Sequence, residues 1–156
     1  PPFWPAKHFI NKNFVEKDVF LKPPKQLAGL VHIEAGFDNQ QPWREIDWLQ
    51  QHCTLPFKSV AFADISATTF AEHLKQLKQR KSVVGIRHIL DEQAQAILSS
   101  KLIHQHFALL AEMAFSFDAQ LSLTDSQGVE LLVGLAKQHK TIRVGGEHFY
   151  MILKLF

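Results

Sequence analysis

The feature that most constrains the fold of this sequence is a repeated alternation of short apolar segments with amphipathic ones. The short segments are rich in β-branched residues, and each is predicted to be a strand. They read LAGLVHIEA, KSVAFADI, SVVGIRHIL, AFSFDAQLSL and TIRV. The segments between them carry apolar residues at spacings of three and four, which is typical of helices that pack one face on a core. Strands joined by helices run in one direction, so the alternation predicts an α/β fold with a parallel sheet.

Four helices are predicted after the first four strands. The second is expected to begin at Ser66 or Thr68, because hydroxyl side chains cap helix N-termini. The residues expected to face the core are Trp43, Ile46, Leu49, Phe70, Leu74, Leu77, Ile103, Phe107, Leu110, Val129, Leu132, Val133 and Ala136. Two architectures fit this pattern: an open doubly wound sheet, or part of an eight-stranded barrel.

The pattern begins at Gln26, which divides the chain into two parts. Residues 1–25 hold five of the seven prolines and show no sustained period, so they are predicted to be an irregular lead-in with a short helix near residues 14–22. Residues 26–156 are predicted to form one domain of successive strand–helix units.

Composition excludes several classes of function. Lys and Arg number 17 against 15 Asp and Glu, and this net charge of +2 is too small and too dispersed to indicate nucleic acid or an anionic membrane as a partner. No apolar run approaches the roughly 20 residues that span a bilayer, and no signal peptide is visible. The single cysteine, Cys53, cannot form an internal disulfide and is expected to be structural. We expect a cytoplasmic protein that acts on a small-molecule substrate.

Polar residues stand where the first four predicted strands end. They are His32, Glu34, Asp64, Arg87, His88, Asp118 and Gln120. The carboxyl ends of parallel strands meet at one edge of a sheet, and ligands bind there in both candidate architectures. These residues are therefore the candidate site.

Side chains alternate along a strand, which limits which of these residues face each other. His32 and Glu34 are expected to share a face, and Arg87 and His88 to point to opposite faces. Asp118 is expected to face away from Gln120. A carboxylate at the position of Glu34 can serve as a metal ligand or a general base. Asp64 can equally cap the helix that follows it.

Other chemistry finds little support. The segment GFDNQQ lacks the repeated glycines that wrap a pyrophosphate, which argues against dinucleotide binding and against a flavodoxin-type binding domain. No G-x-S-x-G motif indicates a nucleophilic serine. His104 and His106 resemble a metal-binding H-x-H motif, but on a helix two residues that are two positions apart point in divergent directions. They are expected to be surface or boundary residues.

Four segments together resemble a known family. In order and spacing, VHIEAGFD with the downstream EIDWLQ, then VAFADI, VVGIRHIL and SFDAQL, are similar to the amidohydrolase-related TIM-barrel hydrolases, in the branch of sugar lactonases and pyrone-dicarboxylate lactonase. The resemblance covers residues 26–144. It implies about strands 2 to 6 of an eight-stranded barrel, and an enzyme that hydrolyses a lactone or a related ester or amide.

The resemblance also implies roles. Glu34 falls on the acidic position of the family's V-H-x-E-A, Arg87 and His88 on its G-I-R-x-x-L, and Gln120 on its F-D-x-Q. These four would be catalytic residues. Arg87 would hold a carboxylate or polarise a carbonyl, and Glu34 and His88 would orient water or a ligand. His32 and Asp64, with Arg87, would contact the substrate.

Departures from the family pattern leave a second hypothesis open. The family has an H-x-H strand before this segment and an aspartate on its last strand, and here His148 stands late and in an unfamiliar setting. We therefore expect a fragment, with a shifted reading frame near its end as one explanation of the tail, in which a divalent metal such as zinc would lack most of its ligands. The alternative is a non-catalytic remnant or interaction module that self-associates through open sheet edges.

Overall fold

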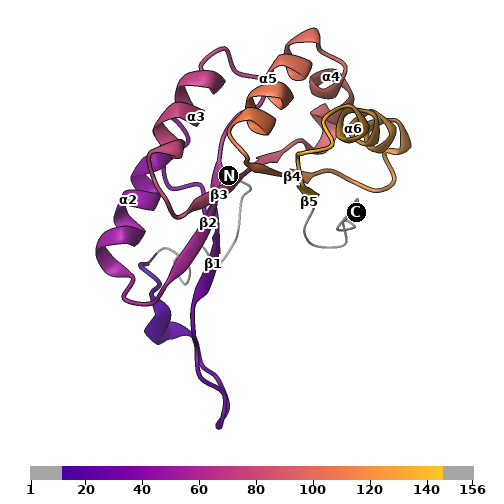
Figure 1. The fold of residues 1–156 in the computed structure, drawn as a ribbon. Coiled ribbons are helices and arrows are strands. Elements are labelled where there is room, and N and C mark those ends of the chain that lie inside the picture. Colours follow the sequence, from indigo (N-terminus) through magenta and orange to yellow (C-terminus); the bar gives the residue numbers. More distant parts are fainter. Residues whose placement is uncertain (1–11, 146–156) are drawn as a thin grey trace.

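A computed structural model describes residues 12–145, and in it the predicted alternation forms one parallel sheet with helices along one face (Figure 1). The strands are β1 (Leu30–Ile33), β2 (Phe57–Phe62), β3 (Val83–Ile89), β4 (Ser116–Gln120) and β5 (Val144–Gly145). The helices are α2 (Trp43–His52), α3 (Phe70–Lys78), α4 (Ala94–Leu98), α5 (Lys101–Glu112) and α6 (Ser126–Gln138), with 3₁₀ turns η1 (Glu16–Asp18) and η2 (Asp91–Gln93). His148 lies outside the described residues.

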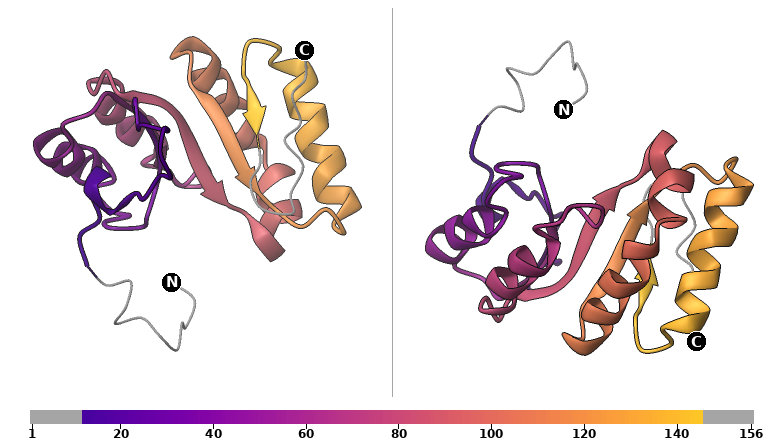
Figure 2. Two further views of the ribbon diagram at one scale, coloured as in Figure 1. Left: turned by 90° about the horizontal axis from the view of Figure 1, so that it is seen from below. Right: turned by 90° about the horizontal axis from the view of Figure 1, so that it is seen from above.

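The strand order settles the architecture. The five strands lie in the order β1-β2-β3-β4-β5, and every neighbouring pair is parallel. Each crossover moves one strand in the same direction, so right-handed connections place all the helices on one face, as Figure 2 shows from below and from above. A doubly wound sheet reverses its order at a switch point and carries helices on both faces. The α/β fold of successive TIM-barrel units is therefore confirmed, and the open doubly wound alternative is wrong.

The core lies between the sheet and the helices. Its largest fully buried side chains include Phe70 of α3, Phe107 of α5 and Phe117 of β4. The rings of Phe107 and Phe117 meet edge to face with 5.2 Å between their centroids. Burial of each such side chain stabilises the fold by about 1.5–3 kcal/mol. Further core residues from the sheet and the helices include Ala61, Ala63, Leu74, Leu77, Ile86, Ile103, Leu110, Ala119, Leu132 and Leu135.

The opposite face of the sheet is not covered by a helix in the described part of the chain. Val31 of β1 is 70% exposed and Ile89 of β3 is 46% exposed. Both alternate with residues that face the helices, since His32 contacts α2 and Ile86 is fully buried. In a complete barrel this face would be the interior. None of the described helices is long and apolar enough to cross a membrane.

Two helices begin elsewhere than predicted. The helix expected from Ser66 or Thr68 starts at Phe70, because the Asp64 carboxylate accepts hydrogen bonds from the Ser66 amide and hydroxyl and forms a turn there. The helix expected near residues 14–22 is limited to the three residues of η1. Its apolar neighbours have no core to pack on, since Phe20 is 85% exposed.

α4 and α6 also differ from the prediction. α4 follows η2 directly and spans only five residues, too few for a periodic pattern. In α6 the buried face includes Leu132, Leu135 and Ala136, whereas Val133 is only half-buried. The inward stripe is therefore rotated from the one expected.

Candidate functional site

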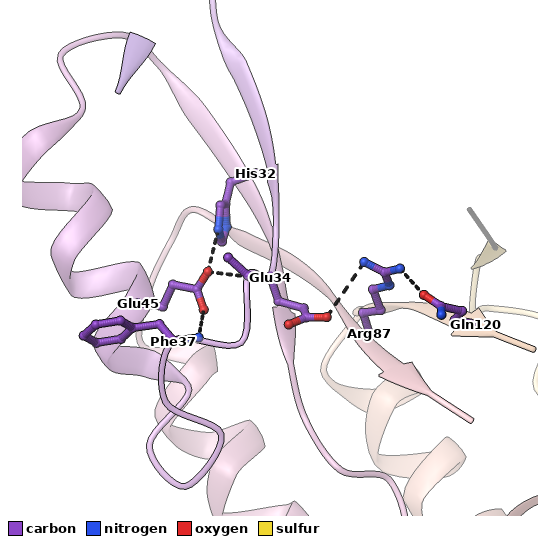
Figure 3. Close-up of polar contacts among 7 residues, drawn as sticks. His32, Glu34, Phe37, Glu45, Arg87 and Gln120 are labelled. Carbon is purple, nitrogen blue, oxygen red and sulfur yellow. Dashed lines mark hydrogen bonds and ion pairs between the residues drawn. The ribbon is translucent and has the colours of Figure 1, made fainter. Parts of the chain in front are cut away.

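A row of three polar side chains crosses the carboxyl ends of β1, β3 and β4 (Figure 3). Nη1 of Arg87 lies 3.8 Å from Oε1 of Glu34, and Nη2 donates a hydrogen bond to Oε1 of Gln120. The side chains of Arg87 and Glu34 are only 13% and 8% exposed. Three residues that are far apart in the sequence, Glu34, Arg87 and Gln120, thus meet at the edge where the sequence predicted a site.

The carboxyl group of Glu34 is held in an unusual electrostatic environment. Burial raises the pKa of Glu34, and the neighbouring Glu45 carboxylate adds to this effect, while the Arg87 guanidinium opposes it. The net effect is a pKa above the ordinary value. A carboxylate with a raised pKa is a better proton acceptor near neutral pH than an exposed one.

Glu45 of α2 organises the turn that follows β1; the sequence indicated it only as the first residue of EIDWLQ and gave it no role. Its Oε1 accepts hydrogen bonds from His32 Nε2 at 2.8 Å and from the Ala35 amide at 2.7 Å, and its Oε2 accepts one from the Phe37 amide at 3.4 Å. Between those amides, Gly36 has a positive φ of 69°, which other residues rarely adopt. The available signal was a glutamate directly before Ile46, a residue that was expected to face the core.

The pKa of Glu45 is shifted in the direction opposite to that of Glu34. Burial would raise the pKa of Glu45, but the hydrogen bonds from His32 and the two amides outweigh burial, so the pKa lies below its ordinary value. Glu45 is therefore ionised and acts as a fixed acceptor. The second nitrogen of its partner, Nδ1 of His32, is buried and has no hydrogen-bond partner among the described residues.

His88 points away from the row, as the alternation predicted. Its Nε2 lies 3.6 Å from Oδ1 of Asp64, and its Nδ1 accepts a hydrogen bond from the Ile65 amide at 3.2 Å. Its ring also meets Phe62 edge to face. The predicted residues thus form two groups: Glu34, Arg87 and Gln120 in the polar row, and His88 with Asp64 against the loop between β2 and α3. His32 contacts Glu45 of α2 instead of the row. The catalytic role of His88 stays a prediction.

The expectation that Asp118 faces away from Gln120 is wrong. Residues two positions apart on a strand share a face, and β4 alternates between half-buried and buried positions so that Ser116, Asp118 and Gln120 lie together. In the β3–β4 register Asp118 is the partner of Arg87. Asp118 therefore belongs to the same face as the polar row.

An open cleft of about 990 Å³ lies at the carboxyl ends of β3 and β4. Gln120 lines it, so the cleft adjoins the polar row. Its other lining residues come from the turns after the two strands and are Ile89, Leu90, Asp91, Glu92, Gln93, Gln95, Ser122, Thr124 and Asp125. The cleft is large enough for a small organic molecule.

The described residues do not fit a metal centre. Within residues 12–145, no group of three or more His, Cys, Asp or Glu side chains is placed to hold a metal ion. The nearest candidates are occupied otherwise, because Glu34 faces the guanidinium of Arg87, and Glu45 faces His32 and two amides. The groups that this edge offers for chemistry are a carboxyl group, a guanidinium and a side-chain amide.

Two solved structures share this arrangement of strands and helices. A crystal structure of an amidohydrolase from Burkholderia multivorans with bound zinc matches with a TM-score of 0.63 and 14% identity, covering 80% of this chain and 43% of that chain. A second crystal form, with bound HEPES, matches with a TM-score of 0.60 and 14% identity, covering 76% and 40%. No family model and no curated protein matches. This chain spans less than half the length of these solved chains, and it has the fold of that part of an amidohydrolase barrel.

Proposed function

We propose that this chain carries part of a hydrolase site that opens a lactone, or a related ester or amide, by attack of an activated water molecule. The observation that carries the proposal is the row of Glu34, Arg87 and Gln120 beside the open cleft. A buried carboxyl group with a raised pKa next to a guanidinium provides a proton acceptor and a carbonyl-binding group in one place. The likeness to amidohydrolase barrels supports the same class of reaction.

The proposed steps use only these side chains. Arg87 donates hydrogen bonds to the substrate carbonyl oxygen, and Glu34 accepts a proton from water as the water oxygen bonds to the carbonyl carbon. The tetrahedral intermediate then breaks its bond to the ring oxygen, which takes the proton from Glu34 and leaves as a hydroxyl group. The product is a hydroxy acid, whose planar carboxylate suits the forked guanidinium of Arg87.

The remaining residues are assigned to binding. Gln120 orients the guanidinium of Arg87 through its hydrogen bond and lines the cleft. Nδ1 of His32, which is buried and has no hydrogen-bond partner within residues 12–145, would accept a hydrogen bond from a substrate hydroxyl. Asp64, whose side chain is 41% exposed, would contact the substrate from the rim, with His88 beside it. No step uses a metal, because the described residues do not form a ligand set.

The substitution Glu34→Gln tests the reaction. Loss of the proton acceptor is expected to lower turnover at least about 100-fold, the usual contribution of a general base. Hydrolysis by the purified chain would be followed by acid release across a panel of sugar lactones, aromatic lactones and amides. The matched control is Glu72→Gln, which changes an exposed glutamate of α3 in the same way. Equal turnover in the two variants, or none in the parent, would contradict the proposal.

A second candidate function is self-association through the uncovered face and edge of the sheet. It is favoured by the exposed aliphatic side chain of Val31 on β1, which is an edge strand of the described sheet. The substitution Val31→Lys would place a charge on that face, and it is expected to convert a dimer to a monomer in sedimentation velocity. A parent chain that sediments as a monomer at high micromolar concentration would exclude this function.

A further inference from the structure

Two histidines from different elements hold the same buried residue. Ile65, fully buried in the loop between β2 and α3, donates its amide hydrogen to Nδ1 of His88 on β3 at 3.2 Å. The carbonyl oxygen of Ile65 lies 2.7 Å from Nδ1 of His106 on α5. Both backbone groups of one loop residue are therefore satisfied by imidazole rings.

This geometry fixes a different tautomer for each ring. A backbone amide only donates, so Nδ1 of His88 must carry a lone pair and its hydrogen must lie on Nε2. A carbonyl only accepts, so Nδ1 of His106 must carry a hydrogen. The Nε2–H of His88 then faces the carboxylate of Asp64 at 3.6 Å.

His106 was expected at the surface or at a boundary, and it is buried instead, with 4% of its area exposed. Its ring lies against Phe70 with 4.5 Å between centroids. Because its hydrogen bond uses an N–H that is present in both the neutral and the protonated ring, protonation of His106 leaves the bond to Ile65 intact. His106 therefore anchors the loop whatever its charge.

Protonation of His88 has a different consequence. The imidazolium carries a hydrogen on both nitrogens, so the bond from the Ile65 amide is lost and a charge pair with Asp64 replaces it. In the structure, Asp64 accepts hydrogen bonds from the Ser66 amide at 2.8 Å and the Ser66 hydroxyl at 2.6 Å. A move of Asp64 towards a charged His88 would break these bonds and open the turn before α3.

The ionisable groups around His88 come from three elements. In the described part of the chain they include Asp64 of the loop, whose charge acts on His88, Arg87 beside it on β3, and His106 of α5 beyond Ile65. Arg87 extends to Glu34 and Gln120 on the other face of the sheet. Asp64 is therefore the carboxylate that responds to the charge of His88.

We propose that His88 and His106 are positioning residues that clamp the loop between β2 and α3, and that the clamp closes only when His88 is neutral. Burial lowers the pKa of His88 more than the Asp64 carboxylate raises it, so the ring is neutral at pH 7 and the clamp is closed. The clamp rests on the proposed function in one respect only, namely that Asp64 contacts the substrate. Its own tests do not depend on turnover.

The first test reads the tautomers directly. In a two-bond ¹⁵N–¹H correlation spectrum at pH 7.5, His88 is expected to show the Nε2–H pattern and His106 the Nδ1–H pattern. A hydrogen on Nδ1 of His88 would overturn the proposal, because that nitrogen could no longer accept from Ile65. This spectrum needs only the parent chain, so it decides the matter even if no variant folds.

The second test follows hydrogen exchange of the Ile65 amide as the pH is lowered through the midpoint of His88, after correction for intrinsic exchange. Protection is expected to fall roughly fivefold, which corresponds to the net free energy of one hydrogen bond. The Ala63 amide, which donates to the Arg87 carbonyl at 3.2 Å, is the internal control. If the two amides change together, the effect is global and the proposal fails.

Two variants complete the second test. In His88→Asn, the side-chain oxygen is the same number of bonds from Cα as Nδ1 and does not titrate, so Ile65 protection should stay high at both pH values. In His88→Leu it should be low at both. A pH-dependent loss that persists in His88→Asn would assign the effect to another group and overturn the proposal.

Discussion

On the helix-covered face of the sheet, Ile86 of β3 lies beside Phe117 of β4, and both side chains are fully buried. One residue further along, the neighbouring pair is Arg87 and Asp118, on the opposite face. The first pair belongs to the apolar core, whereas Arg87 reaches Glu34 and Gln120. Apolar burial on one face stabilises the fold, and the other face is therefore able to hold charged groups together.

Truncation of the covered face should have the largest effect on stability. We expect Phe117→Ala to lower the free energy of unfolding by about 3–5 kcal/mol, because it leaves a cavity against Phe107. Urea denaturation at pH 7 measures this value. The companion change on the open face, Val31→Thr, should cost less than about 0.5 kcal/mol. Similar losses in the two variants would remove the distinction between the faces.

Truncation of the open face should act on chemistry instead. Arg87→Ala is expected to lower turnover about 10²–10³-fold, the usual weight of one carbonyl-binding donor, and to lower stability less than Phe117→Ala does. Rate measurements on the substrate found with the parent chain and urea denaturation together separate the two effects. Arg143→Ala, a change of an exposed arginine before β5, is the control. If stability and turnover fell in proportion, Arg87 would be a structural residue.

The two glutamates near β1 should respond to pH in opposite directions. The pKa of Glu34 is raised, so its contribution to stability is present below about pH 4.5 and is lost as the pH rises through the folded-state pKa. The pKa of Glu45 is lowered, so its contribution is present above about pH 4.5 and is lost as the pH falls through the folded-state pKa.

Urea denaturation of Glu34→Gln and Glu45→Gln at pH 4 and pH 7 checks these signs. The free energy of unfolding of Glu34→Gln, relative to that of the parent, should be higher at pH 7 than at pH 4. That of Glu45→Gln should be lower at pH 7 than at pH 4. Each difference is expected to be on the order of 1 kcal/mol. The physical reason is that glutamine is neutral at both pH values. The same sign in both variants would mean that the two carboxylates share one environment.

The smallest effect is expected where the cleft meets α6. Asp125 caps this helix by accepting a hydrogen bond from the Gly128 amide at 3.0 Å. Asp125→Ala should lower the thermal unfolding temperature, with a loss of about 1 kcal/mol, and Asp125→Ser should recover most of it because serine also caps. An unchanged unfolding temperature in Asp125→Ala would show that the cap does not contribute.

The order of elements could be predicted from the sequence because apolar residues repeat differently in strands and in helices. Most of the elements were long enough to show their repeat. The opposite directions of Arg87 and His88 followed from the same alternation. α4 could not be read, since its five residues hold barely one turn. The burial of His106 depends on the carbonyl of Ile65, 41 residues away in the sequence, and no spacing reveals such a partner.

The candidate site was predictable as a set of strand ends but not as a set of contacts. The meeting of Glu34 with Arg87 follows from parallel strands in sequential order. The division that separates His88 and Asp64 from this row depends on the loop after β2, whose turn no periodic pattern describes. The role of Glu45 was missed because its partners include backbone amides, and the sequence does not show where the turn after β1 places those amides.

The sequential order of the strands also bears on how the chain is made. Each strand pairs with the one synthesised just before it, so a nascent chain leaving the ribosome can add one strand–helix unit at a time without waiting for distant segments. Until the next unit emerges, the newest strand presents unpaired backbone to its surroundings. Slow translation would prolong that exposure, and chaperones would be most useful at those pauses.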